Sequence, residues 1–91
     1  MGIIKINIPS YMQSFTNNMR VVEVNGSTVG ECLSHLVKQF PGIKKWLFSK
    51  NGNLFENIIV SVNGESAYPE QLAKPVKDRD ELKIVFIIGG G

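Results

Sequence analysis

The feature that most constrains the fold is an apolar run near the end of the chain, residues 82–88, which leads directly into three glycines. Branched and aromatic side chains favour β-strands because they pack well on a pleated surface. Side chains alternate between the two faces of a strand, and both faces of this run are apolar. We therefore expect a central strand that is buried on most of both faces. One of these faces would carry Leu82, Ile84, Phe86 and Ile88.

The glycine tail, residues 89–91, is expected to be flexible, because glycine loses more conformational entropy on ordering than any other residue. Chain termini are often disordered in any case, so a frayed end or a cloning remnant is the alternative interpretation. Three extended residues span roughly 10 Å. A tail of this length is long enough to pass through a narrow channel in another protein.

Three further strands are predicted from alternating or continuous apolar residues. Residues 4–8 form the first strand and residues 19–24 the second, and the polar, turn-like stretch 11–18 joins them as a hairpin. Residues 58–62 form the third, which ends at the turn Asn63-Gly64.

The main helix is predicted to begin at Thr28, because Thr28 and Glu31 fit a capping box in which Glu31 reaches back to the Thr28 amide. Pro41-Gly42 ends it. Cys32 lies at the edge of the apolar stripe and is expected to be a buried apolar side chain, whereas His35 is expected on the solvated face. The stripe itself consists of Val29, Leu33, Leu36, Val37 and Phe40.

The segments on either side of the predicted strand 58–62 are shorter and less regular. Residues 43–48 predict one more helical turn, whose Trp46, Leu47 and Phe48 would form a satellite cluster, and Asn51-Gly52 predicts a tight reversal. Residues 65–77 are expected to be irregular, because two prolines interrupt them. Their core contacts would come from Tyr68, Leu72 and Val76. A solvated turn with Asp78, Asp80 and Glu81 would then lead into the last strand.

This order of elements predicts an α+β fold with the main helix across one face of a mixed sheet. The first and last strands are the most apolar, so we expect them to pair in parallel at the centre, connected by the helix-bearing crossover. That is a β-grasp arrangement. Without a linker or repeat, residues 1–91 are interpreted as a single domain.

The formal net charge of +2, from ten basic and eight acidic residues, is too small to indicate a nucleic-acid partner. A protein surface complementary to it would be acidic. Cys32, the single cysteine, cannot form an internal disulfide, which agrees with a reducing compartment. Together with the single histidine it cannot complete a four-ligand zinc site, so no metal is expected.

No apolar run approaches the roughly 20 residues that a membrane span needs, so no membrane partner is expected. The first residues lack the pattern of a signal peptide, and Ile6 stands where a myristoylation motif requires Ser or Thr. The expected location is therefore the cytoplasm.

The sequence contains no catalytic constellation: no Ser, His and acid grouping, no glycine-rich loop between strand and helix, and no Cys-x-x-Cys. The chain is therefore not expected to be an enzyme. The unusual group is the terminal carboxylate, which is a poor electrophile until it is converted to a mixed anhydride. A glycine arm without Cβ atoms would let it enter an enclosed active site.

Several motifs, in order, resemble the MoaD/ThiS family of sulfur carriers, which are ubiquitin-like β-grasp proteins. They are Gly26-Ser27-Thr28-Val29, Val62-Asn63-Gly64-Glu65, the segment 76–81 before an apolar strand, and the terminal Gly-Gly. The longer middle, residues 40–54, is most similar to the MoaD-like, CysO-like branch. Two departures from the family pattern are Arg79, where a glycine is usual, and a third terminal glycine.

The resemblance implies a carrier whose C-terminal glycine is adenylated by an ATP-dependent partner and then converted to a thiocarboxylate. The reactive residue would be Gly91, or Gly90 if the last glycine is trimmed. The resemblance implies no permanently bound cofactor, since ATP is used by the partner. The residues contacting the partner would be Phe86, Ile87, Ile88, Gly89 and Gly90.

The partners implied are the adenylating enzyme, a sulfur donor (a desulfurase or sulfurtransferase), and an acceptor such as a molybdopterin synthase large subunit or a cysteine synthase. Two other interpretations stay open. In one, the chain is a ubiquitin-like modifier that forms isopeptide bonds to lysines through the same glycine. In the other, it is a binding module and the tail is incidental.

Overall fold

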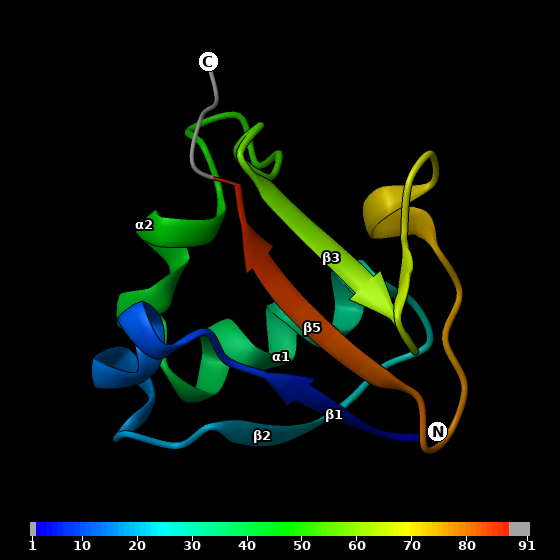
Figure 1. Ribbon diagram of the computed structural model, residues 1–91, viewed down its shortest axis with the longest axis horizontal. Coiled ribbons are helices and arrows are strands. Elements are labelled where there is room, and N and C mark those ends of the chain that lie inside the picture. The colour runs from blue at the N-terminus through cyan, green and yellow to red at the C-terminus, as the bar shows by residue number, and fades with distance from the viewer. Residues whose placement is uncertain (1, 88–91) are drawn as a thin grey trace.

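The fold is built on a five-stranded sheet with the order β2-β1-β5-β3-β4 (Figure 1). The computed structural model describes residues 2–87. The strands are β1 (Ile3–Asn7), β2 (Val21–Asn25), β3 (Ile58–Val62), β4 (Glu65–Ser66) and β5 (Glu81–Phe86). The helices are α1 (Val29–Gln39) and α2 (Lys44–Leu47), with 3-10 helices η1 (Ser10–Thr16), η2 (Pro41–Ile43) and η3 (Gln71–Ala73).

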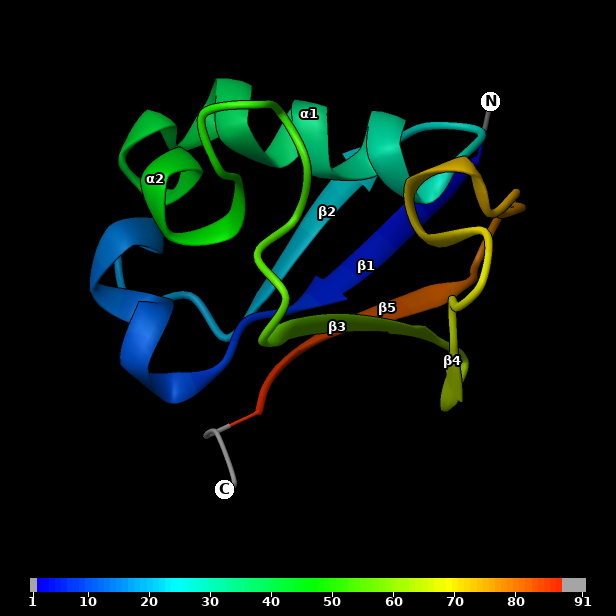
Figure 2. The same cartoon turned by 90° about the horizontal axis from the view of Figure 1, so that it is seen from above.

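Strands β1 and β5 pair in parallel at the centre of the sheet, with Lys5 opposite Glu81 and Asn7 opposite Lys83. Strand β2 is antiparallel to β1, and β3 is antiparallel to β5. Helix α1 lies across one face of this mixed sheet, and the other face is left open (Figure 2). The predicted α+β arrangement with a parallel central pair is confirmed.

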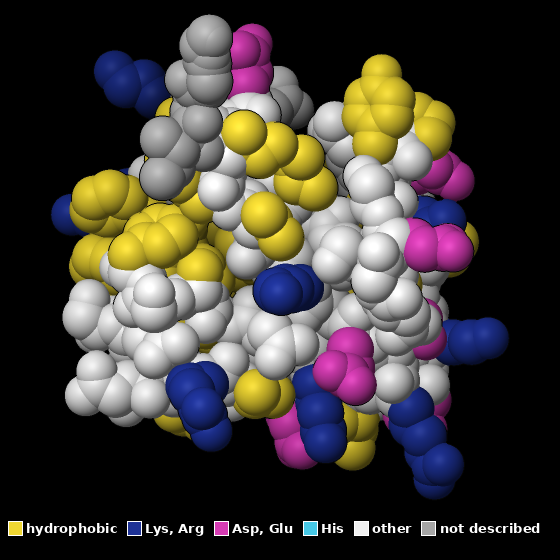
Figure 3. Space-filling view, in the orientation of Figure 1, with side chains coloured by type: hydrophobic (Ala, Val, Ile, Leu, Met, Phe, Trp, Pro, Cys, Tyr) yellow, Lys and Arg dark blue, Asp and Glu magenta, His cyan; other side chains and the backbone are white. Residues whose placement is uncertain are grey.

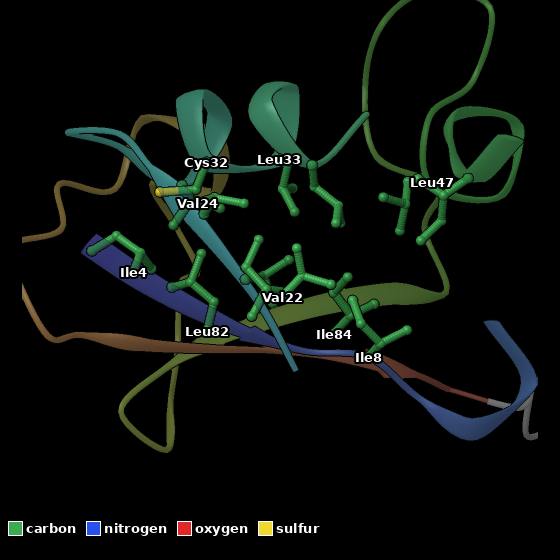
Figure 4. Close-up of a cluster of buried hydrophobic side chains, with 14 of the residues drawn as sticks. Ile4, Ile8, Val22, Val24, Cys32, Leu33, Leu47, Leu82 and Ile84 are labelled. Carbon is green, nitrogen blue, oxygen red and sulfur yellow. The ribbon is translucent and has the colours of Figure 1, made fainter. Parts of the chain in front are cut away.

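The core fills the space between the sheet and the helices (Figure 4). Side chains from β1, α1 and β5, such as Ile4, Leu33 and Leu82, are completely buried there. Leu47 of α2 belongs to the same core, so the expected satellite cluster is wrong for this residue. Its neighbour Trp46 stays half-exposed and packs against Phe15 instead.

The start of α1 follows the predicted capping motif with one shift. The Glu31 amide donates to Thr28 Oγ1 at 3.1 Å, as expected for an N-cap. The Glu31 carboxylate accepts from the amide of Ser27 at 2.7 Å, one residue before the amide predicted. Both bonds satisfy backbone donors near the helix start, and α1 ends before Pro41 as predicted.

The structure corrects three expectations about exposure and regularity. Strand β5 is buried on one face only, because the helices cover one side of the sheet, and Val85 on the other side is 37% exposed. Tyr68 is 73% exposed and is not a core residue. The stretches expected to be turn-like or irregular contain η1, β4 and η3.

The turn before β5 is fixed by Asp80, which is 7% exposed and not solvated as predicted. Its carboxylate accepts from the Lys77 amide and from Asn63 Nδ2, both at 2.9 Å. Asn63 Oδ1 in turn accepts from the Glu81 amide at 2.9 Å. The Lys77 amide, followed by Asn63, holds the pKa of Asp80 below its ordinary value, so the carboxylate is ionised in the folded protein.

Arg79 in the same turn has φ 74°, in the left-handed region that glycine adopts without a steric penalty. Its amide donates to the Ile3 carbonyl at 2.9 Å, which ties the turn to β1. The turn therefore adopts, with an arginine, the geometry that the family's usual glycine would favour.

Replacing Arg79 with glycine is expected to raise the free energy of unfolding by about 1 kcal/mol, because it removes the strain of the left-handed backbone in the folded state. This gain exceeds the stability lost through the greater conformational entropy of the unfolded chain. The Arg79 side chain is 93% exposed and lies 4.0 Å from Asp78, so little is lost with it. Urea unfolding measures the change. Arg79→Ala is the control, since it removes the same side chain and keeps the strain; equal stabilisation by both variants would contradict the explanation.

Replacing Asp80 with Asn is expected to lower the free energy of unfolding at pH 7 by about 1.5–3 kcal/mol, the range for hydrogen bonds to a charged group. Because the folded-state pKa of Asp80 lies below its ordinary value of 3.8, its contribution is present above that pH and is lost as the pH falls through the folded-state pKa. Urea unfolding at a series of pH values should show a steeper loss of stability below pH 3.8 in the wild type than in Asp80→Asn. If the free energy of unfolding falls equally with pH in both proteins, the ionised Asp80 carboxylate does not stabilise the turn.

Candidate functional site

The candidate site lies where three elements meet at one edge of the sheet. Because β1 and β5 are parallel, their C-terminal ends lie at the same edge. Strand β3 runs antiparallel to β5 and therefore begins there. The 3-10 helix η1 follows β1 at this edge, so it lies next to the end of β5 (Figure 1).

The backbone at the end of β5 is held one residue beyond the strand. Phe86 pairs with Ile58, and the Ile87 amide donates to the Asn57 carbonyl at 2.8 Å. The structure therefore brings two of the predicted partner-binding residues, Phe86 and Ile87, to this edge. The others, Ile88, Gly89 and Gly90, and the predicted reactive residue Gly91, lie outside the described residues.

The side chains at this edge form an exposed apolar surface. Val85, Phe86 and Ile87 are between 37% and 45% exposed. Figure 3 shows hydrophobic side chains gathered on this face of the molecule beside the grey residues, whereas charged side chains predominate toward the start of β5. An apolar surface of this kind at a chain end is typical of a protein-protein contact.

Tyr11 of η1 is a site residue that the sequence reasoning missed. Its ring makes an edge-to-face contact with Phe86, with ring centroids 5.2 Å apart. Burial raises the pKa of its hydroxyl, so the group stays neutral at physiological pH. The predicted parallel pairing of the first and last strands could have indicated this contact, because it places the residues that follow the first strand beside the end of the last strand.

Cys32 is not available as a nucleophile. Its side chain is completely buried against the sheet (Figure 4). Burial, with smaller contributions from the charges of Glu31 and Asp80, raises the pKa of the thiol to about 11. The reactive thiolate is therefore nearly absent at neutral pH, and the predicted structural role of Cys32 is confirmed.

His35 has a backbone partner and no catalytic one. Its Nδ1 accepts from the Asn25 amide at 2.8 Å, at the outer edge of β2. The side chain is half-buried and lies on the face of α1 that also carries the exposed Ser34 and Lys38, as predicted. Among residues 2–87, no group of three or more His, Cys, Asp and Glu side chains could hold a metal ion. Within the same residues, no helix has the length and apolar character needed to cross a membrane.

Comparison with known proteins agrees with this geometry. A model of the ThiS family matches residues 6–91. The sulfur carrier protein CysO of Mycobacterium tuberculosis is 28% identical over 91 residues, which cover 97% of this chain and 98% of the relative. The small archaeal modifier protein 1 of Haloferax volcanii is 35% identical over 71 residues, which cover 77% of this chain and 78% of the relative.

Solved structures give the same result. A chain of the Amycolatopsis orientalis BexX/CysO complex has a TM-score of 0.88 at 31% identity and covers 97% of this chain and 99% of that one. The small archaeal modifier protein 1 of Haloferax volcanii has a TM-score of 0.85 at 28% identity and covers 99% of this chain and 100% of that one. The family match includes the glycine tail as well as the sheet, so the chain belongs to the ThiS family and has the β-grasp fold.

Proposed function

We propose that this chain is a sulfur carrier whose C-terminal glycine is adenylated and then converted to a thiocarboxylate. The observation that carries the proposal is the position of β5. This central strand is anchored through Ile87 and leads, in the sequence, to residues without side chains. The globular part then serves to present the terminal carboxylate to other proteins.

The proposed chemistry has two steps, both performed in partner enzymes. In the first, the carboxylate oxygen attacks the α-phosphate of ATP, which forms an acyl-adenylate and releases pyrophosphate. In the second, the terminal sulfur of a persulfide on the donor attacks the activated carbonyl and AMP leaves, which gives an acyl disulfide. A second thiol of the partner enzymes then reduces this acyl disulfide, which releases the thiocarboxylate and leaves a disulfide in the partner enzymes. The glycines contribute by their size, because a chain without Cβ atoms fits between closely spaced protein walls.

The chain itself is proposed to be a substrate and carrier and not an enzyme. Its cysteine is protonated and buried, and its histidine bonds a backbone amide. We propose that it binds no permanent cofactor, that ATP is bound by the adenylating partner, and that the protein works in the cytoplasm.

The remaining partners follow from the family. We propose a desulfurase or sulfurtransferase as the sulfur donor, and a molybdopterin synthase large subunit or a cysteine synthase as the acceptor. The name of the mycobacterial relative supports sulfur carriage. The solved BexX/CysO complex supports binding of a carrier of this shape to a second protein.

The second candidate function is that of a ubiquitin-like modifier, joined through the same glycine to lysines of other proteins. The observation that favours it is the likeness to the small archaeal modifier protein 1. Both functions require adenylation of the terminal glycine. They differ in the nucleophile that attacks the adenylate: sulfur in one case, a lysine amine in the other.

Incubating the full chain with an adenylating enzyme of its family, ATP and a sulfur source is expected to replace one terminal oxygen with sulfur. Intact-mass spectrometry detects the change, and fragmentation places it at the C-terminus. A variant lacking residues 89–91 is the control and should remain unmodified. Absence of the adduct with several such enzymes would refute sulfur carriage, and glycine-dependent conjugates in a cell lysate would favour the modifier instead.

The same assay identifies the activated glycine. We expect the full chain, ending at Gly91, to be loaded directly. A variant that ends at Gly90 should then be loaded more slowly, because its carboxylate stops one residue short of the nucleotide. If only the shorter variant is loaded, the chain requires trimming before activation.

A further inference from the structure

Two pairs of aromatic side chains involve η1, one with the end of β5 and the other with helix α2. Phe86 contacts Tyr11 at a centroid distance of 5.2 Å, and Phe15 contacts Trp46 at 5.5 Å. Tyr11 and Phe15 both belong to η1, so one short 3-10 helix carries a member of each pair. We call Phe86, Tyr11, Phe15 and Trp46 the aromatic track.

Two members of the aromatic track are unusually exposed for their size. Tyr11 and Trp46 are each 46% exposed, although large aromatic side chains contribute most to stability when they are buried. Tyrosine and tryptophan at protein surfaces are enriched among the residues that dominate binding energy. The packing of Trp46 on Phe15 also fixes the indole in position, which lowers the entropy lost when a partner binds.

The charged side chains in and around α2 are positive. Residues 32–55 contain four lysines and no acidic residue, and residues 1–22 contain no acidic residue either. Lys44 and Lys45, next to Trp46, are exposed. The ion pairs found within residues 2–87 are Lys74–Glu70 and Arg79–Asp78, so neither lysine of α2 is neutralised by a described acidic residue. An acidic surface is the complement of this region.

We infer that the aromatic track and the two lysines of α2 form a docking surface for the adenylating enzyme, which would present acidic residues and an apolar recess beside the opening to its nucleotide site. The inference rests on the proposed function. The partner is the adenylating enzyme because both sulfur transfer and lysine conjugation begin with adenylation. The track includes Phe86, which precedes the glycine tail by three residues in the sequence, so an enzyme that receives the tail comes close to it.

The two parts of this surface contribute differently. Lysines on short exposed helices steer an acidic partner and raise the association rate, an effect that weakens with salt. Trp46 and Tyr11 contribute contact area that persists at high salt. A glycine tail has no side chains to orient it, so a rigid surface beside its exit fixes the direction from which it enters the enzyme.

Exposed aromatic residues elsewhere supply a control. Tyr68 and Phe55 line a different recess of about 610 Å³ beside β3. Tyr68 is more exposed than Trp46, yet it belongs to a region that holds most of the acidic residues. Lys77 and Arg79, exposed in the turn that leads into the start of β5, provide the matched charge control.

The test measures ATP–pyrophosphate exchange by the adenylating enzyme at varied concentrations of the full chain. The double variant Lys44→Glu/Lys45→Glu is expected to raise KM for the chain about tenfold with kcat unchanged, and the difference should shrink as salt is added. Trp46→Ala should raise KM by about tenfold or more at all salt concentrations. Trp46→Phe, which keeps a ring against Phe15, should fall between wild type and Trp46→Ala.

The controls Lys77→Glu/Arg79→Glu and Tyr68→Ala should retain the wild-type KM, and thermal unfolding of every variant verifies that it is folded. If the wild type is activated and the α2 variants match it, the docking surface is refuted while the proposed function stands. If the charge control loses as much as the α2 double variant, the effect is one of net charge and the docking surface is refuted. If the enzyme does not activate the wild type, the proposed function fails and the docking surface with it.

Discussion

The parallel pairing of β1 with β5 is the constraint on which the rest of the structure depends. Two parallel strands cannot be joined by a tight turn, so the chain between them must cross over the sheet, and that crossover supplies α1 and the second wall of the core. The pairing also places both C-terminal strand ends at one edge. The element after β1 and the residues after β5 therefore become neighbours, although some seventy residues of sequence separate Tyr11 from Phe86.

The two ends of β5 are stabilised in different ways. At its start, the Asp80 carboxylate and the Asn63 side chain satisfy three backbone or side-chain donors within a turn, and Arg79 tolerates a left-handed conformation to maintain it. At its end, the Ile87 amide donates a hydrogen bond to the Asn57 carbonyl and so holds the backbone, and apolar side chains remain exposed. The side-chain hydrogen bonds thus lie at the start of β5, away from the end that leads in the sequence to the proposed reactive residue.

The periodicity of apolar residues in the sequence predicted the strands and the helix that bury a single face. The strands, the capped helix and the parallel centre follow from alternation, from Thr28 and Glu31, and from the apolar character of the terminal strands. The alternation of apolar residues does not reveal whether a second layer covers the other face of the sheet, so the expected burial of Val85 was too high. The apolar character of an aromatic ring such as Tyr68 likewise does not ensure that it lies in the core. The role of Asp80 depends on Asn63, which is 17 residues away and adjacent only after β3 and β5 pair. Long-range contacts of this kind have no local signal.

The proposed carrier role accounts for a site that is built, among the described residues, from apolar and aromatic side chains. An enzyme holds reactive groups rigidly in a pocket, whereas a carrier must deliver one group to several different pockets. A reactive group at the end of a side-chain-free segment satisfies this requirement. Under the proposed function, the fold then contributes the surfaces that partner proteins recognise. Partners that share one tail must still be distinguished. The side chains able to do this are the exposed ones beside the end of β5: the apolar residues of β5 itself, the aromatic rings of η1 and α2, and the lysines of α2. Under the proposed function, the fold therefore fixes the position and direction of β5, and the surface beside the end of β5 selects the partner.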